Sequence, residues 1–285
     1  MVVSVDRVRA RMLDGLAADA LPGAIDQMVS GWRCKASPDL PFRRANCVLP
    51  TADAGDDLRR AKKVVAEIER GYRELGRRVL VQVSSADAQV EALDTLLAAR
   101  DYVVEAPVDV LVAPRERVAF AAAGALPELE SSVGRGVAVA VASRPAGFRA
   151  DPGATAPWLE LVDGVHGDDD GWRARTAAYG RVMESVPAAA HLGSVSLGRF
   201  EETIGIGFGV VAEGWLGVFG MGTAIAWRRR GVAACLLGAF AEEAAIEAEQ
   251  MYLQVEVDNV PAQALYASLG FVRSHGYHYR VKDVS

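Results

Sequence analysis

The sequence has 285 residues, of which 51% are apolar and 24% are charged, a composition typical of a folded globular protein with room for one large domain or two smaller ones. The net charge of −6 disfavours a nucleic-acid partner, because such proteins normally present a basic face. The sequence contains neither an apolar run long enough to span a membrane nor an uncharged apolar segment typical of a signal peptide, so we expect a cytoplasmic protein.

Strands and helices are predicted along the whole chain from apolar periodicity and turn residues. In the first half we expect a strand over 42–50, an amphipathic helix over 57–76 and a strand–helix–strand unit over 81–112. In the second half we expect a helix over 119–132, a strand over 136–143, helices over 156–164 and 171–186, strands over 189–198, 202–214 and 214–225 with a tight turn at Glu213-Gly214, and a helix over 231–250.

The chain contains an internal repeat. Residues 253–281 and residues 81–112 each begin with an apolar-Gln-Val strand, continue into a helix and reach an aromatic residue, Phe271 or Tyr102, before another strand. The pattern predicts two copies of one α/β unit, with domains over 1–130 and 131–285. Coincidence is the alternative, because strand–helix–strand order is common.

Three consecutive arginines, Arg228–Arg230, precede Gly231 and the predicted helix. A helix N-terminus leaves backbone N–H groups unpaired and carries partial positive charge, and glycine lets a ligand approach the backbone. The spacing Arg-x-x-Gly-x-Ala therefore indicates a cradle for a pyrophosphate. The alternative is a solvated helix start. A nucleic-acid patch is disfavoured because the helix that follows carries several glutamates.

Two segments in this half, RRRGVA (228–233) and NVPAQALYASLGF (259–271), together resemble the two signature motifs of the GNAT acetyltransferase superfamily. The element order is similar to that family over about 135–285, and the two-halved chain resembles the tandem GNAT proteins. The resemblance implies an α/β (α+β) fold of two GNAT-like domains, each with a mixed, mostly antiparallel sheet flanked by helices.

By the same resemblance, the protein is an acetyl-CoA-dependent N-acetyltransferase that transfers an acyl group directly to an amine of a small molecule or protein. Independently of the resemblance, charge, hydropathy and cysteine spacing predict no nucleic acid, membrane or metal, and we expect a monomer or homodimer. Backbone groups of Met221, Gly222 and Thr223 would contact the pantetheine arm, and Asn259 would contact the cofactor. The pyrophosphate would be held by Arg228, Arg229, Arg230, Gly231, Val232, Ala233 and Ala234.

Tyr266 is the catalytic residue that the resemblance implies, as the acid that protonates the departing thiolate. The alternative for Tyr266 is a core aromatic. No motif fixes a general base, and each of the candidates is more readily a surface carboxylate or a satisfied histidine; they are Asp163, His191, Glu201, Glu202 and Glu213. A water chain could also replace a single base. The alternative function is a non-catalytic acyl-CoA-binding regulatory or scaffold protein.

The first half departs from the family pattern. It has no Arg-x-x-Gly-x-Ala before its long helix, Leu97 stands where Tyr266 is expected, and Asp101 stands where Gly270 is expected. We therefore expect a degenerate GNAT-like domain without acyl-CoA, in which Trp32 belongs to the core. The three cysteines have no paired spacing and are expected to be reduced and buried, Cys235 included, with no metal site.

Overall fold

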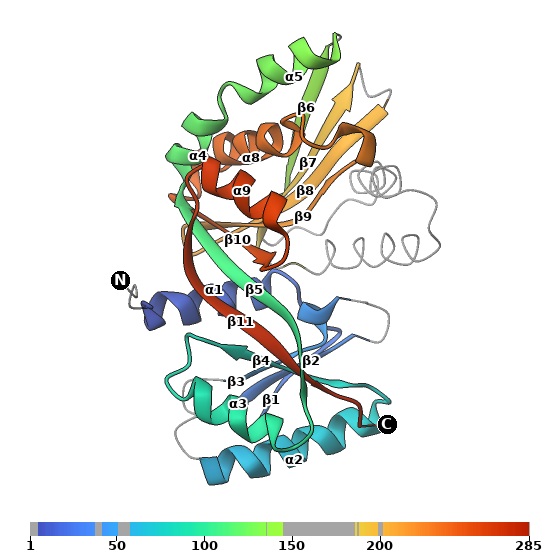
Figure 1. Ribbon diagram of the computed structural model, residues 1–285, viewed down its shortest axis with the longest axis vertical. Coiled ribbons are helices and arrows are strands. Elements are labelled where there is room, and N and C mark those ends of the chain that lie inside the picture. Colours follow the sequence, from blue (N-terminus) through green and yellow to red (C-terminus); the bar gives the residue numbers. More distant parts are fainter. Residues whose placement is uncertain are drawn as a thin grey trace. The chain divides into compact units, whose positions relative to one another are not determined.

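The computed structural model describes residues 5–37, 42–50, 58–134, 136–144, 186, 188–198 and 202–284 (Figure 1). The helix expected over 156–164, and all of that over 171–186 except Val186, lie outside these ranges. Packing divides the chain into two units. Unit 1 comprises Met1–Val110, Val255–Asn259 and Arg273–Ser285, and unit 2 comprises Leu111–Gln254 and Val260–Val272.

Unit 1 contains a sheet of strand order β1-β2-β3-β4-β11-β5. Within this sheet β1 pairs antiparallel with β2, β2 with β3, and β4 with β11, whereas β3 and β4 pair parallel. The elements in chain order are α1 (Arg7–Asp19), β1 (Ile25–Val29), β2 (Trp32–Ala36), η1 (Arg43–Ala45), β3 (Val48–Pro50), α2 (Leu58–Glu74), β4 (Val79–Ser84), α3 (Val90–Ala98), β5 (Val103–Pro114) and β11 (Val272–Lys282).

The core of unit 1 follows from two periodicities. Apolar residues of α2 recur at i, i+3 and i+4, and this face, which includes Val64, Val65 and Ile68, packs into the apolar core. Strand β4 contributes every second residue to the same core, namely Val79, Val81 and Val83. Trp32 is fully buried there, which confirms its expected core position. The other face of β4 carries Gln82, which hydrogen-bonds helix α1 instead.

Unit 2 has the strand order β5-β10-β9-β8-β7-β6. Its strands β6 to β9 pair antiparallel, and β9 and β10 pair parallel. After the end of β5, the elements are α4 (Arg115–Ala122), α5 (Ala125–Val133), β6 (Val137–Arg144), β7 (Ala189–Leu197), β8 (Glu202–Ala212), β9 (Trp215–Thr223), η2 (Ile225–Trp227), α8 (Val232–Glu243), η3 (Ala244–Ile246), β10 (Gln250–Glu256) and α9 (Val260–Ser268).

Helix α8 packs closely on one face of this sheet because glycines line the contact (Figure 1). A Cβ atom added to Gly193 would lie 2.6 Å from the Leu236 side chain, and one added to Gly207 would lie 3.2 Å from the same residue. Glycine at these positions of β7 and β8 therefore lets the helix lie close to the sheet. Cys235 of α8 is buried, as expected.

The two predicted repeats share one backbone motif at the helix end. In unit 2, the N–H of Phe271 donates to the carbonyl of Tyr266, and the N–H of Gly270 donates to Ala267. In unit 1, Tyr102 donates to Leu97 and Asp101 donates to Ala98 in the same way. Both are Schellman caps with a left-handed residue, Gly270 at φ 92° and Asp101 at φ 67°. The two segments therefore end their helices in the same way, although this cap is common in proteins, and the repeat stays a prediction.

We expect Asp101→Gly to stabilise the protein by about 0.5–1 kcal/mol, because glycine adopts the left-handed conformation without the steric cost that a Cβ atom brings. Urea unfolding at equilibrium measures the change. Asp101→Ala is the matched control, since it removes the same carboxylate and keeps the steric cost. Equal stability of the two variants would show that the charge, and not the backbone conformation, is responsible.

The fold class predicted from the sequence is confirmed: helices flank a mixed, mostly antiparallel sheet in both units. The tight turn at Glu213-Gly214 is also present, with φ of 52° and 74°. None of the helices in the described residues is long and apolar enough to cross a membrane.

Candidate functional site

Strands β9 and β10 separate in the middle of unit 2. Their parallel pairing runs from Trp215↔Gln250 to Val218↔Leu253. Beyond this point, as far as the described residues show, β9 pairs only with β8, up to Thr223. The segment of β9 expected to hold the pantetheine arm, which includes Met221, lies in this separated part. Because β10 no longer pairs with it, its backbone is open to a ligand on that edge.

A bulge lies in the same part of β9. Strand β8 pairs Ile206 with Gly222 and Phe208 with Phe219, so two residues of β9, Gly220 and Met221, stand opposite one residue of β8. Gly220 adopts φ 58°, a conformation that glycine adopts without strain. A bulge leaves ladder groups unpaired and turns the strand locally, so it changes the direction of the backbone N–H groups at the site.

The loop after β9 leads directly into the N-terminus of α8. Arg229 and Gly231 both adopt left-handed conformations, with φ of 63° and 87°, and no side chain caps the helix that begins at Val232. The first intrahelical bond is donated by Cys235 to the carbonyl of Gly231. The N–H groups at the start of α8 therefore have no intrahelical acceptor and form an anion-binding end.

The three arginines of the loop are exposed. The Nε atom of Arg228 donates to the carbonyl of Thr223 at 3.3 Å, and the guanidinium of Arg230 lies 5.1 Å from the ring centroid of Trp227. The Trp227 indole in turn donates to Glu202 at 2.9 Å. The loop is thus held by its own side chains, with cationic groups next to the helix start.

Tyr266 lies on α9, with 9% of its surface exposed. Its ring packs edge-on against Phe271, with centroids 5.9 Å apart. Burial raises the pKa of this phenol above its usual value, which keeps it protonated at neutral pH. Such a group can donate a proton but does not act readily as a base.

Asn259 is exposed and immediately precedes α9, and its backbone N–H donates to the carbonyl of Glu256 at 3.0 Å. It belongs to unit 1, whereas the loop before α8 belongs to unit 2. Its contact with a cofactor stays a prediction.

The candidates for a general base have different surroundings. The Nδ1 atom of His191 lies 2.9 Å from the Ser143 hydroxyl, and its Nε2 atom lies 3.3 Å from a Glu247 carboxylate oxygen without hydrogen-bond geometry. Burial lowers the pKa of His191. Glu202 binds Trp227 and Glu213 is exposed in a turn. Two others, Asp163 and Glu201, lie outside the described residues.

The sequence motifs did not single out Gln254. It follows Leu253, the last residue of β10 that pairs with β9, and its Oε1 atom is buried without a hydrogen-bond partner within the described part of the chain. A buried acceptor without a donor is costly in a folded protein. The signal that could have found it was the repeated apolar-Gln-Val triplet, in which Gln254 corresponds to Gln82.

Residues 191–273 match the family described as the acetyltransferase (GNAT) domain. Solved structures share the fold. A GCN5-related N-acetyltransferase from Kribbella flavida is 14% identical with a TM-score of 0.64, over 96% of this chain and 95% of that one. A tandem GNAT protein from the clavulanic acid biosynthesis pathway is 13% identical with a TM-score of 0.58, over 81% of this chain and 71% of that one.

A conserved protein of unknown function from Staphylococcus epidermidis is also similar, with 11% identity and a TM-score of 0.62, over 92% of this chain and 95% of that one. No curated protein sequence matches the chain. The chain therefore contains a domain of the GNAT acetyltransferase family and has the fold of these proteins, as the two motifs predicted. Identities this low establish the fold and leave the substrate open.

Proposed function

We propose that the protein is an N-acetyltransferase that transfers an acyl group from acetyl-CoA to an amine of a small molecule or protein. The observation that carries the proposal is that one strand–loop–helix segment places an open strand edge directly before an uncapped helix N-terminus. Strand β9 loses its β10 partner after Val218, and the chain then turns through Gly231 into an uncapped helix N-terminus. The open strand edge suits an extended amide-containing arm, and the helix N-terminus suits a pyrophosphate.

In this proposal the chain's own residues hold acetyl-CoA, which supplies the acyl group as a thioester. The backbone groups of Met221, Gly222 and Thr223 bind the pantetheine arm and polarise the thioester carbonyl. The pyrophosphate oxygens accept hydrogen bonds from N–H groups at the start of α8, and Arg228–Arg230 add positive charge. Asn259 makes a further contact with the cofactor.

Tyr266 is then the proton donor. The amine nitrogen forms a bond to the carbonyl carbon, the carbon–sulfur bond breaks, and the sulfur takes a proton from the phenol, while the amine gives up a proton to water or a base. A buried, protonated phenol has the required form at neutral pH.

We further propose that the family domains extend over 1–130 and 131–285, with acyl-CoA bound only in the second. The first half keeps the helix cap of the repeat but has Leu97 in place of Tyr266, and acidic residues precede its long helix. Leu97 is fully buried, so the equivalent position serves packing. The protein in this proposal acts in the cytoplasm as a monomer or homodimer.

Release of free thiol from acetyl-CoA across a panel of amines tests the proposed function. We expect turnover with at least one amine, and calorimetry should show one CoA bound per chain. If acetyl-CoA raises the melting temperature but no amine releases CoA, the protein binds the cofactor without catalysis. If acetyl-CoA neither binds nor reacts, both interpretations of the site are wrong.

A further inference from the structure

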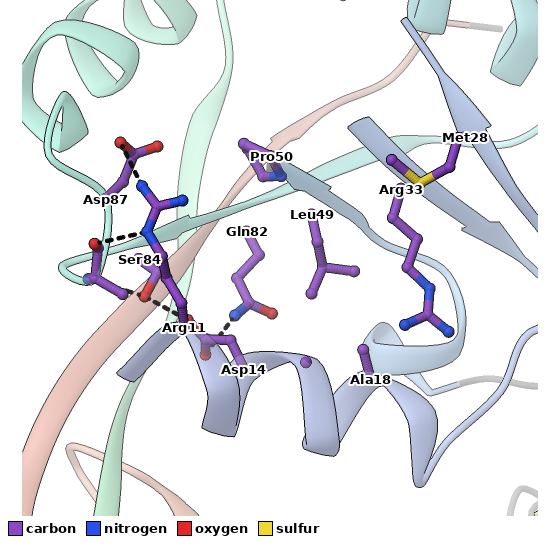
Figure 2. Close-up of a pocket in the computed structure, with 12 residues that line it drawn as sticks. Arg11, Asp14, Ala18, Met28, Arg33, Leu49, Pro50, Gln82, Ser84 and Asp87 are labelled. Atoms are coloured by element: carbon purple, nitrogen blue, oxygen red, sulfur yellow. Dashed lines mark hydrogen bonds and ion pairs between the residues drawn. The ribbon is translucent and has the colours of Figure 1, made fainter. Parts of the chain in front are cut away.

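Unit 1 contains a pocket of about 320 Å³ between helix α1 and the sheet (Figure 2). All its lining residues belong to unit 1 and come from α1, β1 to β4 and the turn after β4. Its volume lies at the lower end of the range for small-molecule sites. The proposed acetyltransfer site lies wholly on other residues, so this pocket needs its own explanation.

The pocket lies where two parallel strands part. Strands β3 and β4 pair at Val48↔Val81, and the pocket is lined by the residues that follow on each strand, Leu49 and Pro50 on β3 and Gln82 on β4. In the internal repeat, β4 corresponds to β10, so this opening corresponds to the separation of β9 and β10. Unit 1 has therefore kept an opening between strands while its sequence has lost the phosphate motif.

One wall of the pocket is a prearranged hydrogen-bond acceptor. The Nε2 group of Gln82 donates to Asp14 Oδ1 at 2.9 Å, and the Ser84 hydroxyl donates to Asp14 Oδ2 at 2.7 Å. Because its amide nitrogen is fixed on the carboxylate, Gln82 presents Oε1 to the pocket (Figure 2). Asp14 also lies 3.2 Å from Nε2 of the fully buried His275. This acidic, acceptor-rich wall suits a ligand ammonium group.

The guanidinium of Arg11 lies one helical turn before Asp14 on α1. Arg11 and Asp14 are three residues apart on α1, so their side chains share one face. The Nε atom of Arg11 donates to the Ala86 carbonyl at 3.3 Å, and its Nη2 atom lies 3.6 Å from Asp87. Its Nη1 atom has no partner within the described residues and turns towards the pocket (Figure 2). This nitrogen can pair with a ligand carboxylate.

The other cation in the lining is already engaged. Arg33 donates to Asp19 at 2.7 Å and to both carboxylate oxygens of Asp26. The remaining surface is apolar, formed mainly by Leu49, Pro50 and Met28. Within the described residues the pocket thus offers one guanidinium nitrogen without a partner, Nη1 of an arginine that is already paired with Asp87, together with one acceptor wall and an apolar wall.

Gly15 shows that the space beside α1 is open. A Cβ atom added at this helical glycine would meet nothing within 4 Å, although Gly15 lines the pocket. A larger side chain there would enter the pocket without a clash at its first atom. A larger side chain would also stabilise helix α1, because glycine lowers the stability of a helix relative to most other residues.

We propose that this pocket binds a free amino acid with a medium-sized apolar side chain. Its ammonium group meets Gln82 Oε1 and the Asp14 carboxylate, its carboxylate meets Arg11 Nη1, and its side chain lies against Leu49 and Pro50. The degenerate half of the protein is then a small-molecule-binding domain with a ligand class different from acyl-CoA.

Calorimetric titration of the full chain, without acetyl-CoA, tests the site with the twenty common L-amino acids. We expect saturable binding of a free amino acid with an apolar side chain, such as L-leucine. The probes isoamylamine and 4-methylpentanoate lack the carboxylate and the ammonium group respectively, and each should bind roughly tenfold or more weakly. Equal binding of the amino acid and of either probe would refute recognition of both charges.

Gly15→Leu should abolish binding and leave the protein folded. The matched control is Gly71→Leu, a second helical glycine whose added Cβ atom also meets nothing within 4 Å and which does not line the pocket; it should bind normally. Arg11→Gln should lower the affinity for L-leucine to the affinity that the native chain has for isoamylamine, which lacks the carboxylate. The proposal is wrong if no amino acid binds the native chain, or if Gly15→Leu binds as the native chain does.

Discussion

Gly231→Asp should abolish CoA binding, because a carboxylate would stand at the helix start that is expected to hold the pyrophosphate. Gly231 adopts φ 87° immediately before α8, and no side chain of the described residues caps this end of the helix with a hydrogen bond. The aspartate places negative charge against phosphate oxygens and cancels the favourable field of the N–H groups. We expect affinity for CoA to fall roughly a hundredfold or more.

Gly231→Asn is the matched control, because asparagine has nearly the same shape as aspartate and also tolerates the left-handed conformation. It should weaken CoA binding much less than Gly231→Asp does. A Cβ atom at this position meets only the Ala125 carbonyl oxygen, at 3.7 Å, so both variants should fold. Calorimetry gives the dissociation constants, and an unchanged constant for Gly231→Asp would refute the cradle.

Tyr266→Phe should lower kcat about a hundredfold to ten-thousandfold, the usual contribution of a general acid, with little change in affinity for acetyl-CoA. Phenylalanine retains the edge-on packing against Phe271 and removes only the proton donor. A loss of kcat and of kcat/KM together identifies an interaction made in the transition state. Steady-state thiol release gives these constants, and calorimetry gives the affinity.

Tyr102→Phe is the control for Tyr266→Phe. Tyr102 is also buried, and it follows the helix cap of unit 1 that corresponds to the one after Tyr266. Its substitution should leave kcat unchanged. A normal kcat for Tyr266→Phe, at intact cofactor affinity, would show that Tyr266 is a core aromatic and that another donor protonates the thiolate.

Much of the fold could be predicted because its signals are local. The period of α2, the alternation along β4 and the turn residues Glu213-Gly214 each report on the conformation of a few neighbouring residues. The signal for the loop before α8 is also local, because a glycine with positive φ and a helix start lie within one short segment. Local chemistry therefore predicted many of the elements and the candidate cradle, whereas the fold class was implied by the resemblance of two motifs to a known family.

Features that depend on strands distant in sequence could not be predicted. Strand β11 pairs with β4, so Tyr277 lies opposite Ser84, whereas the sequence places it in the second copy of the repeat. The burial of Gln254 Oε1 likewise depends on where β9 and β10 cease to pair. A single amino-acid sequence carries no direct signal for such pairings.

The sequence by itself determined the α/β elements and, through two motifs, the resemblance to the GNAT family, and it predicted a phosphate-binding loop in one half. The tertiary structure alone decided what the other half contains: packing of α1 against parting strands brings Arg11, Asp14 and Gln82 around one pocket. The physical reason is that capping, turn preference and periodicity act over a few residues. A pocket depends on packing between elements many residues apart, which no local pattern encodes.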